Sequence, residues 1–319
     1  MNKPKVYIDG KEGTTGLQIY ERLGGREDIE LLLIDEDKRK DPAERKKLMD
    51  AADIVFLCLP DAAAIEAVSL VESPTTRIID ASTAHRVAPG WVYGFPEIGN
   101  REAIRNAKRV ANPGCHATGF IATVAPLRQL GILPADYPLA CYSLTGYSGG
   151  GKKMIAQYED ENRDAELSSP RIYGLTLQHK HLPEMETIAD LDYPPVFNPV
   201  VDDYYKGMAT TILLQNRLLN GVSTAEDVAQ ALAKYYEGQR MVRVVPFGGQ
   251  DAMLGANKLA GKDYLEITVC GNDRQTMVTA RFDNLGKGAS GAAVQNMNIM
   301  LGFAETAGLS VDEKEKTIC

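Results

Sequence analysis

The first 80 residues alternate short apolar segments with helical ones, and this alternation constrains the fold more than any other feature of the sequence. Residues 5–9 (KVYID), 29–35 (IELLLID), 53–59 (DIVFLCL) and 77–80 (RIID) are typical of buried strands. Between them, residues 17–25, 41–52 and 61–71 predict helices, the last with Asp61 as its N-cap. Strands that alternate with helices predict a parallel sheet with right-handed crossovers.

A glycine-rich turn joins the first predicted strand to the first helix. Gly10, Gly13 and Gly16 are spaced G-x-x-G-x-x-G. A tight turn at this point lets backbone N–H groups and a helix N-terminus contact a pyrophosphate, although the usual dinucleotide-binding spacing is G-x-G-x-x-G. The position favours a Rossmann dinucleotide-binding domain over a turn that binds no ligand.

The end of the second strand leaves the choice of nicotinamide cofactor open. Acidic residues at 35–37 favour a free ribose 2′-hydroxyl, whereas the basic residues at 38–40 favour a 2′-phosphate. The hydroxyl groups of Thr14 and Thr15 could also donate hydrogen bonds to a phosphate. The cofactor contacts that we predict are Gly10, Gly13, Thr14, Thr15, Gly16, Arg39, Ser82 and Asn284.

From about residue 138 the strands cluster, which predicts an α+β second domain. Residues 139–145, 171–177 and 208–214 predict strands, 265–270 and 276–282 a hairpin, and 223–236 a helix capped by Ser223 or Thr224. A small-residue helix at 288–303 is expected to pack back on the first domain. The predicted class is therefore α/β. Residues 1–113 and 287–319 form the dinucleotide-binding domain, and residues 114–286 the catalytic and oligomerisation domain.

One cysteine lies where its thiol could react. Cys115 follows a Pro-Gly turn and begins a predicted helix that ends near Gly131. The positive end of a helix dipole and its free N–H groups stabilise a thiolate. A thiolate can displace phosphate from an acyl phosphate, and the resulting thioester accepts a hydride. All five cysteines are scattered and are expected to be free thiols in a reducing compartment. Cys58, Cys141 and Cys270 are expected to be inert packing residues, and Cys319 is terminal.

Histidines are the candidates for proton transfer to and from the cysteine. His179 and His181 form an HKH segment, and on an extended chain they would point to opposite faces, so that only one would face Cys115. A metal site is not expected, because no further His or Cys lies nearby at ligand spacing. His116 should diverge from the adjacent Cys115, and His85 is a weaker candidate.

Two features could bind an anion. Ser148, Gly149 and Lys152 belong to a glycine-rich loop (GYSGGGKK) whose backbone could form an anion nest. Arg86 follows the end of a strand, where sites lie in α/β sheets. Either could hold a substrate phosphate or carboxylate, and for each one alone a solvated loop with exposed bases is an equal alternative.

Charge and hydropathy exclude some classes of partner. The net charge of −8 argues against nucleic acid, because phosphate backbones require a basic surface. No apolar run approaches the roughly 20 residues that span a bilayer, and no N-terminal signal is visible. We therefore expect a cytoplasmic protein without a membrane partner that acts on a small molecule.

Four segments resemble those of one enzyme family. ANPGCHATG (111–119), GYSGGGKK (146–153), HKHLPEM (179–185) and DNLGKGASGAAVQNMNIMLG (283–302) look like N-acetyl-γ-glutamyl-phosphate reductases of the shorter form. The resemblance runs from about residue 6 to 308, and the last segment is similar also in aspartate-semialdehyde dehydrogenases. GKEGTTG (10–16) departs from the G-x-x-G-Y-x-G-like turn of the longer form.

The resemblance implies that an acyl phosphate is reduced by NADPH to N-acetylglutamate 5-semialdehyde in arginine biosynthesis. It places the nucleophile on Cys115 and an H-x-H-x-x-E-like motif on His179, His181 and Glu184, with His181 slightly preferred as the acid/base and Glu184 as a substrate contact. It also implies a homodimer or homotetramer. The alternatives are an aspartate-semialdehyde dehydrogenase, a catalytically silent nucleotide-binding regulator, and a cysteine acyltransferase or hydrolase without cofactor.

Overall fold

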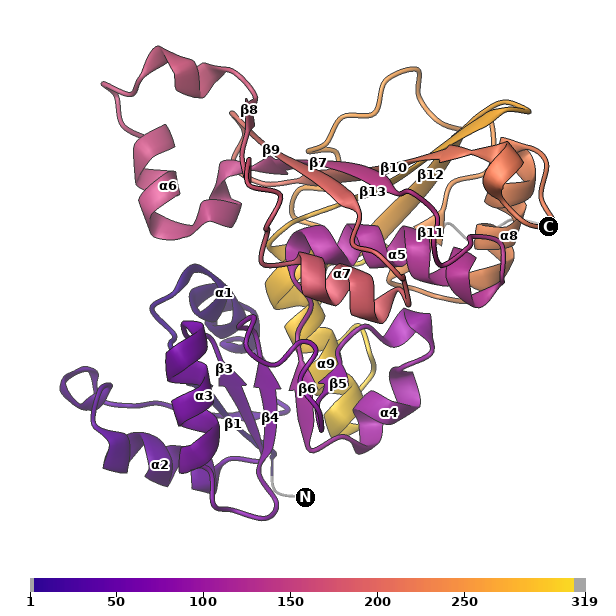
Figure 1. The fold of residues 1–319 in the computed structure, drawn as a ribbon. Helices are drawn as coiled ribbons and strands as arrows, with labels where there is room; N and C mark the ends of the chain where they lie inside the picture. Colours follow the sequence, from indigo (N-terminus) through magenta and orange to yellow (C-terminus); the bar gives the residue numbers. More distant parts are fainter. Residues whose placement is uncertain (1–2, 313–319) are drawn as a thin grey trace.

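The computed structural model describes residues 3–312, which form two sheets with helices around and between them (Figure 1). The first sheet has six parallel strands in the order β2-β1-β3-β4-β6-β5. Their bounds are β1 Lys5–Asp9, β2 Glu30–Leu32, β3 Ile54–Leu57, β4 Arg77–Asp80, β5 Val92–Tyr93 and β6 Arg109–Ala111. The helices between them are α1 Thr14–Leu23, α2 Pro42–Ala51, α3 Asp61–Leu70 and α4 Arg101–Asn106. The predicted parallel α/β arrangement is confirmed.

Alternate side chains of the strands divide the helices between the two faces of this sheet. Val6 and Ile8 of β1 pack in one apolar cluster with residues of α1 and α4. Tyr7, between them, packs in another cluster with residues of α2 and α3. Successive strand residues point to opposite faces, so a strand that is apolar throughout needs helices on both sides. The sheet is therefore doubly wound.

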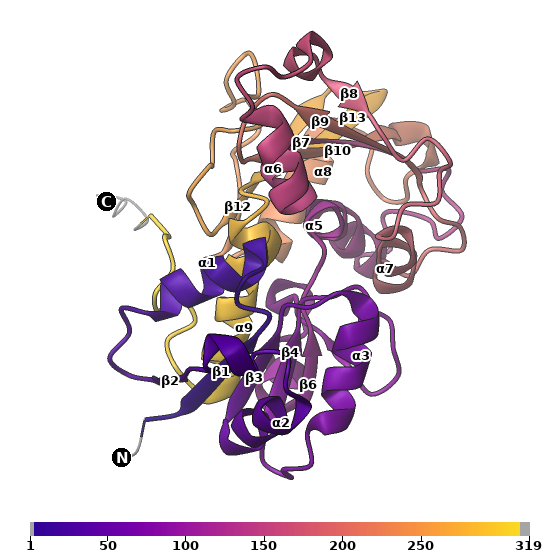
Figure 2. The ribbon, with the colours of Figure 1, turned by 90° about the vertical axis from the view of Figure 1, so that its left-hand side faces the viewer.

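The C-terminal helix completes one of these faces. A π-helical turn, η6 (Gly286–Ser290), leads into α9 (Gly291–Leu301), whose Ala293, Val294 and Met297 are fully buried against the strands. Figures 1 and 2 show α9 beside β4 and β6, on the first sheet rather than on the second sheet to which the preceding strand, β13, belongs. The predicted return of this helix to the first domain is confirmed.

The second sheet is mixed and has seven strands in the order β11-β12-β13-β10-β7-β9-β8. Their bounds are β7 Ala140–Gly146, β8 Arg171–Ile172, β9 Val196–Asp202, β10 Met208–Gln215, β11 Val242–Val244, β12 Leu265–Gly271 and β13 Gln275–Phe282. The helices are α5 Cys115–Gln129, α6 Gly151–Tyr158, α7 Leu182–Ile188 and α8 Ala225–Tyr235. Buried residues of α5, including Phe120 and Val124, pack with the sheet in the largest apolar cluster. α5 and α7 thus lie between the second sheet and the first domain (Figure 1).

Several local predictions were wrong. β2 has three residues rather than seven, because it is an edge strand and its residues are only partly covered. The strand predicted at 171–177 ends at Ile172. Asp61 does not cap α3, whose N-cap is Pro60. Its carboxylate accepts hydrogen bonds from the backbone and hydroxyl of Thr83 instead.

The segment predicted as a glycine-rich loop is helical. Residues 147–150 form a 3-10 turn, η3, and α6 begins directly at Gly151. Gly151 has a positive φ of 72°, which a glycine adopts without strain and which redirects the chain into the helix. Between the two residues offered as a cap for α8, Thr224 makes the capping box with Asp227.

We propose domain boundaries at 113/114 and 286/287, since each follows a change from one sheet to the other. The junction is packed, because Tyr93 and Phe95 of the N-terminal part share the apolar cluster of α5. None of the helices within residues 3–312 has the length and apolar character needed to cross a bilayer.

Candidate active site

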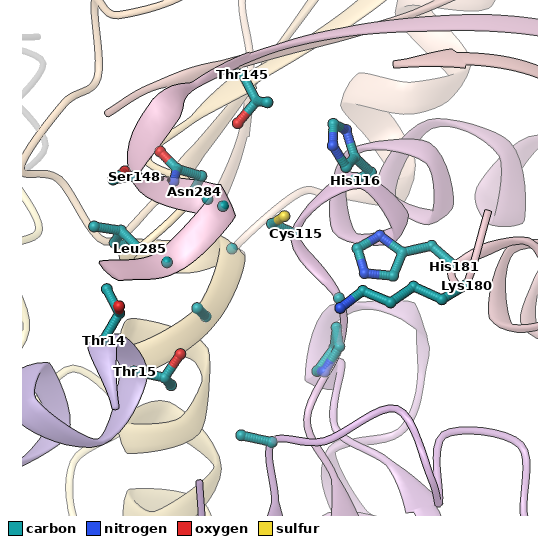
Figure 3. A pocket seen from close by; sticks show the side chains of 18 of the residues that line it. Thr14, Thr15, Cys115, His116, Thr145, Ser148, Lys180, His181, Asn284 and Leu285 are labelled. Atoms are coloured by element: carbon teal, nitrogen blue, oxygen red, sulfur yellow. Dashed lines mark hydrogen bonds between the residues drawn. The ribbon is translucent and has the colours of Figure 1, made fainter. Parts of the chain in front are cut away.

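A cavity of about 440 Å³ lies where the two domains meet. Its lining comes from the glycine turn and the start of α1, the end of β3, the start of α5, the η3–α6 segment, the turn before α7 and the loop at η6 (Figure 3). α6 faces the start of α1 across it (Figures 1 and 2). The predicted site residues in this lining are Gly13, Thr14, Thr15, Arg86, Cys115, Ser148, Gly149, His179, His181 and Asn284.

Cys115 is the first residue of α5, and its sulfur faces the cavity (Figure 3). The N-cap, Gly114, has no side chain, so the first N–H groups of the helix are not capped by one. A Cβ at Gly114 would lie 2.6 Å from Nε2 of His181 and 2.6 Å from Oε1 of Glu184. Gly114 is therefore the residue that lets these side chains approach the cysteine turn, a role that the Pro-Gly pair alone did not indicate.

Burial raises the pKa of the Cys115 thiol above its ordinary value. The charge of Arg86 and the backbone N–H of His116 act in the opposite direction but do not outweigh burial. Burial therefore opposes the expected thiolate at the helix tip, because desolvation of an anion works against the stabilisation by the helix terminus. The thiol must transfer its proton to a base before it can attack.

The ring of His181 lies against the cysteine turn, with Nε2 2.6 Å from where a Cβ on Gly114 would be. Its ring is 4% exposed, and its Nδ1 has no hydrogen-bond partner among the described residues. Burial lowers its pKa well below the ordinary value, with the charge of Arg86 acting in the same direction. The ring is thus neutral at physiological pH and can accept a proton.

His179 lies beside His181 rather than on the opposite side. Their ring centroids are 4.7 Å apart, and Nδ1 of His179 accepts a hydrogen bond from the backbone N–H of His181 at 3.2 Å. The prediction of opposite faces is wrong because the chain turns at residues 180–181 instead of remaining extended. Burial lowers the pKa of His179 to about 4.

The other two histidines are held by hydrogen bonds. His116 bonds Ser143 through Nδ1 and the hydroxyl of Tyr173 through Nε2, and burial lowers its pKa to about 3. Ser143 in turn bonds Thr210 at 2.7 Å. His85 bonds Asp80 and stacks on Trp91, away from the cavity lining.

Arg86 and Glu184 form a buried ion pair with Nη1 and Oε1 2.6 Å apart. Glu184 also accepts hydrogen bonds from the hydroxyl of Tyr93 and the backbone N–H of Gly114. It is 1% exposed and does not line the cavity. Its bonds fix Arg86 and the cysteine turn, and the predicted contact of Glu184 with substrate stays a prediction.

Five further predicted residues lie outside the cavity lining. Lys152 is exposed on α6, whereas Lys180, which sequence reasoning passed over, lines the cavity. The Ser82 hydroxyl donates to Asp80 and borders neither this cavity nor the one described next. Gly10 and Arg39 border that second cavity, and Gly16 is buried in the first turn of α1.

Asn284, which does line the cavity, joins two of its walls. Its side chain donates to Ser148 Oγ and accepts from the backbone N–H of Gly207. The first bond connects the loop before η6 to η3, and the second connects that loop to the segment between β9 and β10, so Asn284 also helps to fix the shape of the cavity.

The second cavity, of about 500 Å³, lies on the other side of the glycine turn and is lined by residues from β1, β2 and α2. Gly10 has φ +84°, and a Cβ on Gly10 would overlap the carbonyl oxygen of Cys58. A Cβ on Gly16 would overlap the carbonyl oxygen of Gly10. The backbone of the turn therefore lies between the two cavities with no side chain over it, beside a start of α1 that no side chain caps. Exposed backbone N–H groups at a helix start are what binding of a dinucleotide pyrophosphate requires.

No cluster of three or more His, Cys, Asp or Glu side chains in the part of the chain that the structure describes could hold a metal ion. The fold and the cavity define a two-domain dehydrogenase with a cysteine at the domain junction. The chain belongs to the semialdehyde dehydrogenase family and, within it, to the N-acetyl-gamma-glutamyl-phosphate reductases. The predicted resemblance and fold class are thereby confirmed.

Two family descriptions cover most of the chain. "Semialdehyde dehydrogenase, NAD binding domain" matches residues 5–107, and "Semialdehyde dehydrogenase, dimerisation domain" matches residues 115–284. The chain is therefore an oxidoreductase with a nicotinamide dinucleotide domain, and the second match supports the expected oligomer.

Curated relatives and solved structures agree with this assignment. The "N-acetyl-gamma-glutamyl-phosphate reductase 2" of Nostoc sp. is 50% identical, covering 97% of this chain and 100% of its own. The "N-acetyl-gamma-glutamyl-phosphate reductase" of Sinorhizobium fredii is 50% identical over 94% of this chain and 99% of its own. A structure of aspartate semialdehyde dehydrogenase II from Vibrio cholerae has a TM-score of 0.73 at 18% identity, covering 95% of this chain and 99% of that one, and shares the fold.

Proposed function

We propose that this enzyme reduces N-acetyl-γ-glutamyl phosphate with NADPH to N-acetylglutamate 5-semialdehyde and phosphate, a step of arginine biosynthesis. The observation that carries the proposal is the position of Cys115 in a cavity that also contains His181 and an uncapped helix start. The names of the relatives at about 50% identity support the acetylated glutamyl substrate. Aspartate-semialdehyde dehydrogenases share the fold at 18% identity, which does not favour their substrate here.

The neutral imidazole of His181 accepts the proton of the Cys115 thiol, and the sulfur attacks the acyl carbon. The uncapped N–H groups at the start of α5 face the carbonyl oxygen as it gains charge, as in an oxyanion hole. Phosphate leaves and an acyl thioester remains on Cys115. A bound reduced nicotinamide supplies the hydride. The protonated His181 then returns its proton to the thiolate as the aldehyde is released.

The residues around the second cavity favour NADPH over NADH. Arg39 and Lys40 line this cavity, as does Glu36. Asp35, which would bind a free ribose hydroxyl, does not line it and instead pairs with Lys38 at 3.3 Å. Two basic side chains near the end of β2 suit a ribose 2′-phosphate. The expected result is a lower KM for NADPH than for NADH, reversed in part by Arg39→Ala.

We further propose that the protein works in the cytoplasm as a homodimer or homotetramer. The match to a dimerisation domain supports an oligomer. Light scattering of the purified protein distinguishes the two assemblies, and a monomer at micromolar concentration would contradict the proposal.

The reverse reaction tests the chemistry. Nicotinamide absorbance is followed with N-acetylglutamate semialdehyde or aspartate semialdehyde, each with phosphate and NADP. Turnover with the acetylated substrate is expected, and turnover with neither rejects the reductase. Cys115→Ser should abolish turnover and leave NADP binding unchanged, whereas Cys270→Ser, at a half-buried position near the end of β12, should change neither.

A further inference from the structure

The cavity around Cys115 is lined by basic side chains but by no acidic ones. Its lining includes two basic side chains, Arg86 and Lys180, and no Asp or Glu. The carboxylate of Asp61 lies outside the lining but interacts electrostatically with both, and it already accepts two hydrogen bonds from Thr83. The charge of Arg86 is offset by Glu184 in the buried ion pair. Among residues 3–312, which the structure describes, none forms an ion pair or a hydrogen bond with Lys180. A cavity with this balance attracts an anion.

Lys180 is held next to the reacting groups by its position in the chain. It lies between His179 and His181, in the turn that brings both rings together. Figure 3 shows its amine pointing into the space below Cys115. The side chain itself is exposed, so an anion that it contacts can exchange with solvent.

The charge of Lys180 acts on the thiol and on the imidazoles that line the cavity. Burial dominates the pKa shifts of Cys115, His116 and His179, and the charge of Lys180 lowers the pKa of each of them. A charge that acts on the thiol and on two imidazoles is close enough to act also on a group that leaves the acyl carbon.

We propose that Lys180 binds the phosphate group of the substrate and stabilises it as it departs. A bond forms between the sulfur of Cys115 and the acyl carbon. The bond between the acyl carbon and the bridging phosphate oxygen breaks. The bonding electron pair stays on the phosphate oxygen, and the thiol proton goes to His181. The phosphate gains negative charge in this step, so an ammonium beside it favours the transition state over the ground state. Lys is suited to this contact as a compact charge with rotatable donors. The assignment rests on the proposed function, because the phosphate comes from the acyl phosphate.

The other anionic group on such a substrate is its carboxylate. Steady-state kinetics show whether Lys180 binds the phosphate or the carboxylate. In the reverse reaction, Lys180→Met should raise the KM for inorganic phosphate about 10- to 100-fold, the equivalent of one charge-assisted hydrogen bond. The KM for the semialdehyde should stay within about twofold. Lys180→Arg should recover most of the phosphate affinity. Lys153→Met, an exposed lysine on α6 that does not line the cavity, is the matched control.

A second measurement does not depend on turnover. Inorganic phosphate should protect Cys115 from alkylation by iodoacetamide in the wild type and in Lys153→Met, but not in Lys180→Met. If the KM for the semialdehyde rises instead, Lys180 holds the carboxylate and the proposal is wrong. Equal protection in all variants also overturns it. Absence of turnover in the wild type would reject the proposed reaction, while the protection result still decides whether Lys180 binds phosphate.

Discussion

Removing one member of the buried pair Lys287–Glu97 should destabilise the protein more than removing both. Lys287, in η6, is 1% exposed, and its Nζ lies 2.7 Å from Oε1 of Glu97. Nζ also donates to Gln295, which itself donates to Glu97. Oε2 of Glu97 has no partner among the described residues. Lys287→Met would therefore leave a carboxylate buried with one amide donor.

The cost of such an unpaired charge is about 3–5 kcal/mol, whereas replacing both partners is close to neutral. A domain of this size loses about 2 °C in Tm per kcal/mol. We expect Lys287→Met to lower Tm by about 6–10 °C. Lys287→Met combined with Glu97→Gln should recover most of this loss, because the amide oxygen introduced at position 97 would still accept from Gln295. Urea and thermal unfolding of wild type, both single variants, the double variant and Lys153→Met give the comparison. A double variant as unstable as Lys287→Met would refute the reasoning, since the cost would then lie in lost packing.

Three further changes have outcomes that the structure determines. Gly16→Ala should weaken NADPH binding about tenfold or more, because the added Cβ would overlap the carbonyl oxygen of Gly10. Gly25→Ala should leave binding unchanged, because the space around its Cβ is open. Fluorescence titration with NADPH measures both variants. Acidification should destabilise the fold between pH 6.5 and about 4, because the pKa of buried His179 is lower in the folded protein than its unfolded value of 6.5. The unfolded chain therefore takes up the proton first as the pH falls. Urea unfolding at a series of pH values should show a free energy of unfolding that does not change above pH 6.5 and that falls below it. Thr224→Ala should cost about 1 kcal/mol by loss of the capping box, and Ser223→Ala close to none, in the same unfolding assay.

The order of elements in the first domain could be predicted because each strand is apolar on both faces and is bounded by glycine, proline or charge. The helix start at Cys115 could be predicted for a similar local reason, since a Pro-Gly turn before a helix is a short-range pattern. The length of β2 was overestimated, because an apolar run does not show that the strand lies at the edge of the sheet, where fewer neighbours cover it.

What could not be predicted depends on contacts between distant segments. The ion pair of Arg86 with Glu184 spans 98 residues of sequence, so no local pattern shows that it neutralises the arginine. The same is true of the turn that places both His179 and His181 at the cavity and turns Lys180 toward it. The direction of the Cys115 pKa follows from burial of its thiol in the folded protein, which a helix-terminus argument does not include.

The nucleotide-binding sheet is completed by a helix that follows every strand of the second sheet in the sequence. Ala293, Val294 and Met297 of α9 close the face of the sheet that begins with residues 5–9. On the ribosome, that face therefore stays without its final cover until the whole second sheet has been translated. A nascent chain stalled before α9 presents a bare apolar sheet surface to chaperones, and a stop codon at residue 291 would be expected to yield aggregated protein rather than a shorter enzyme.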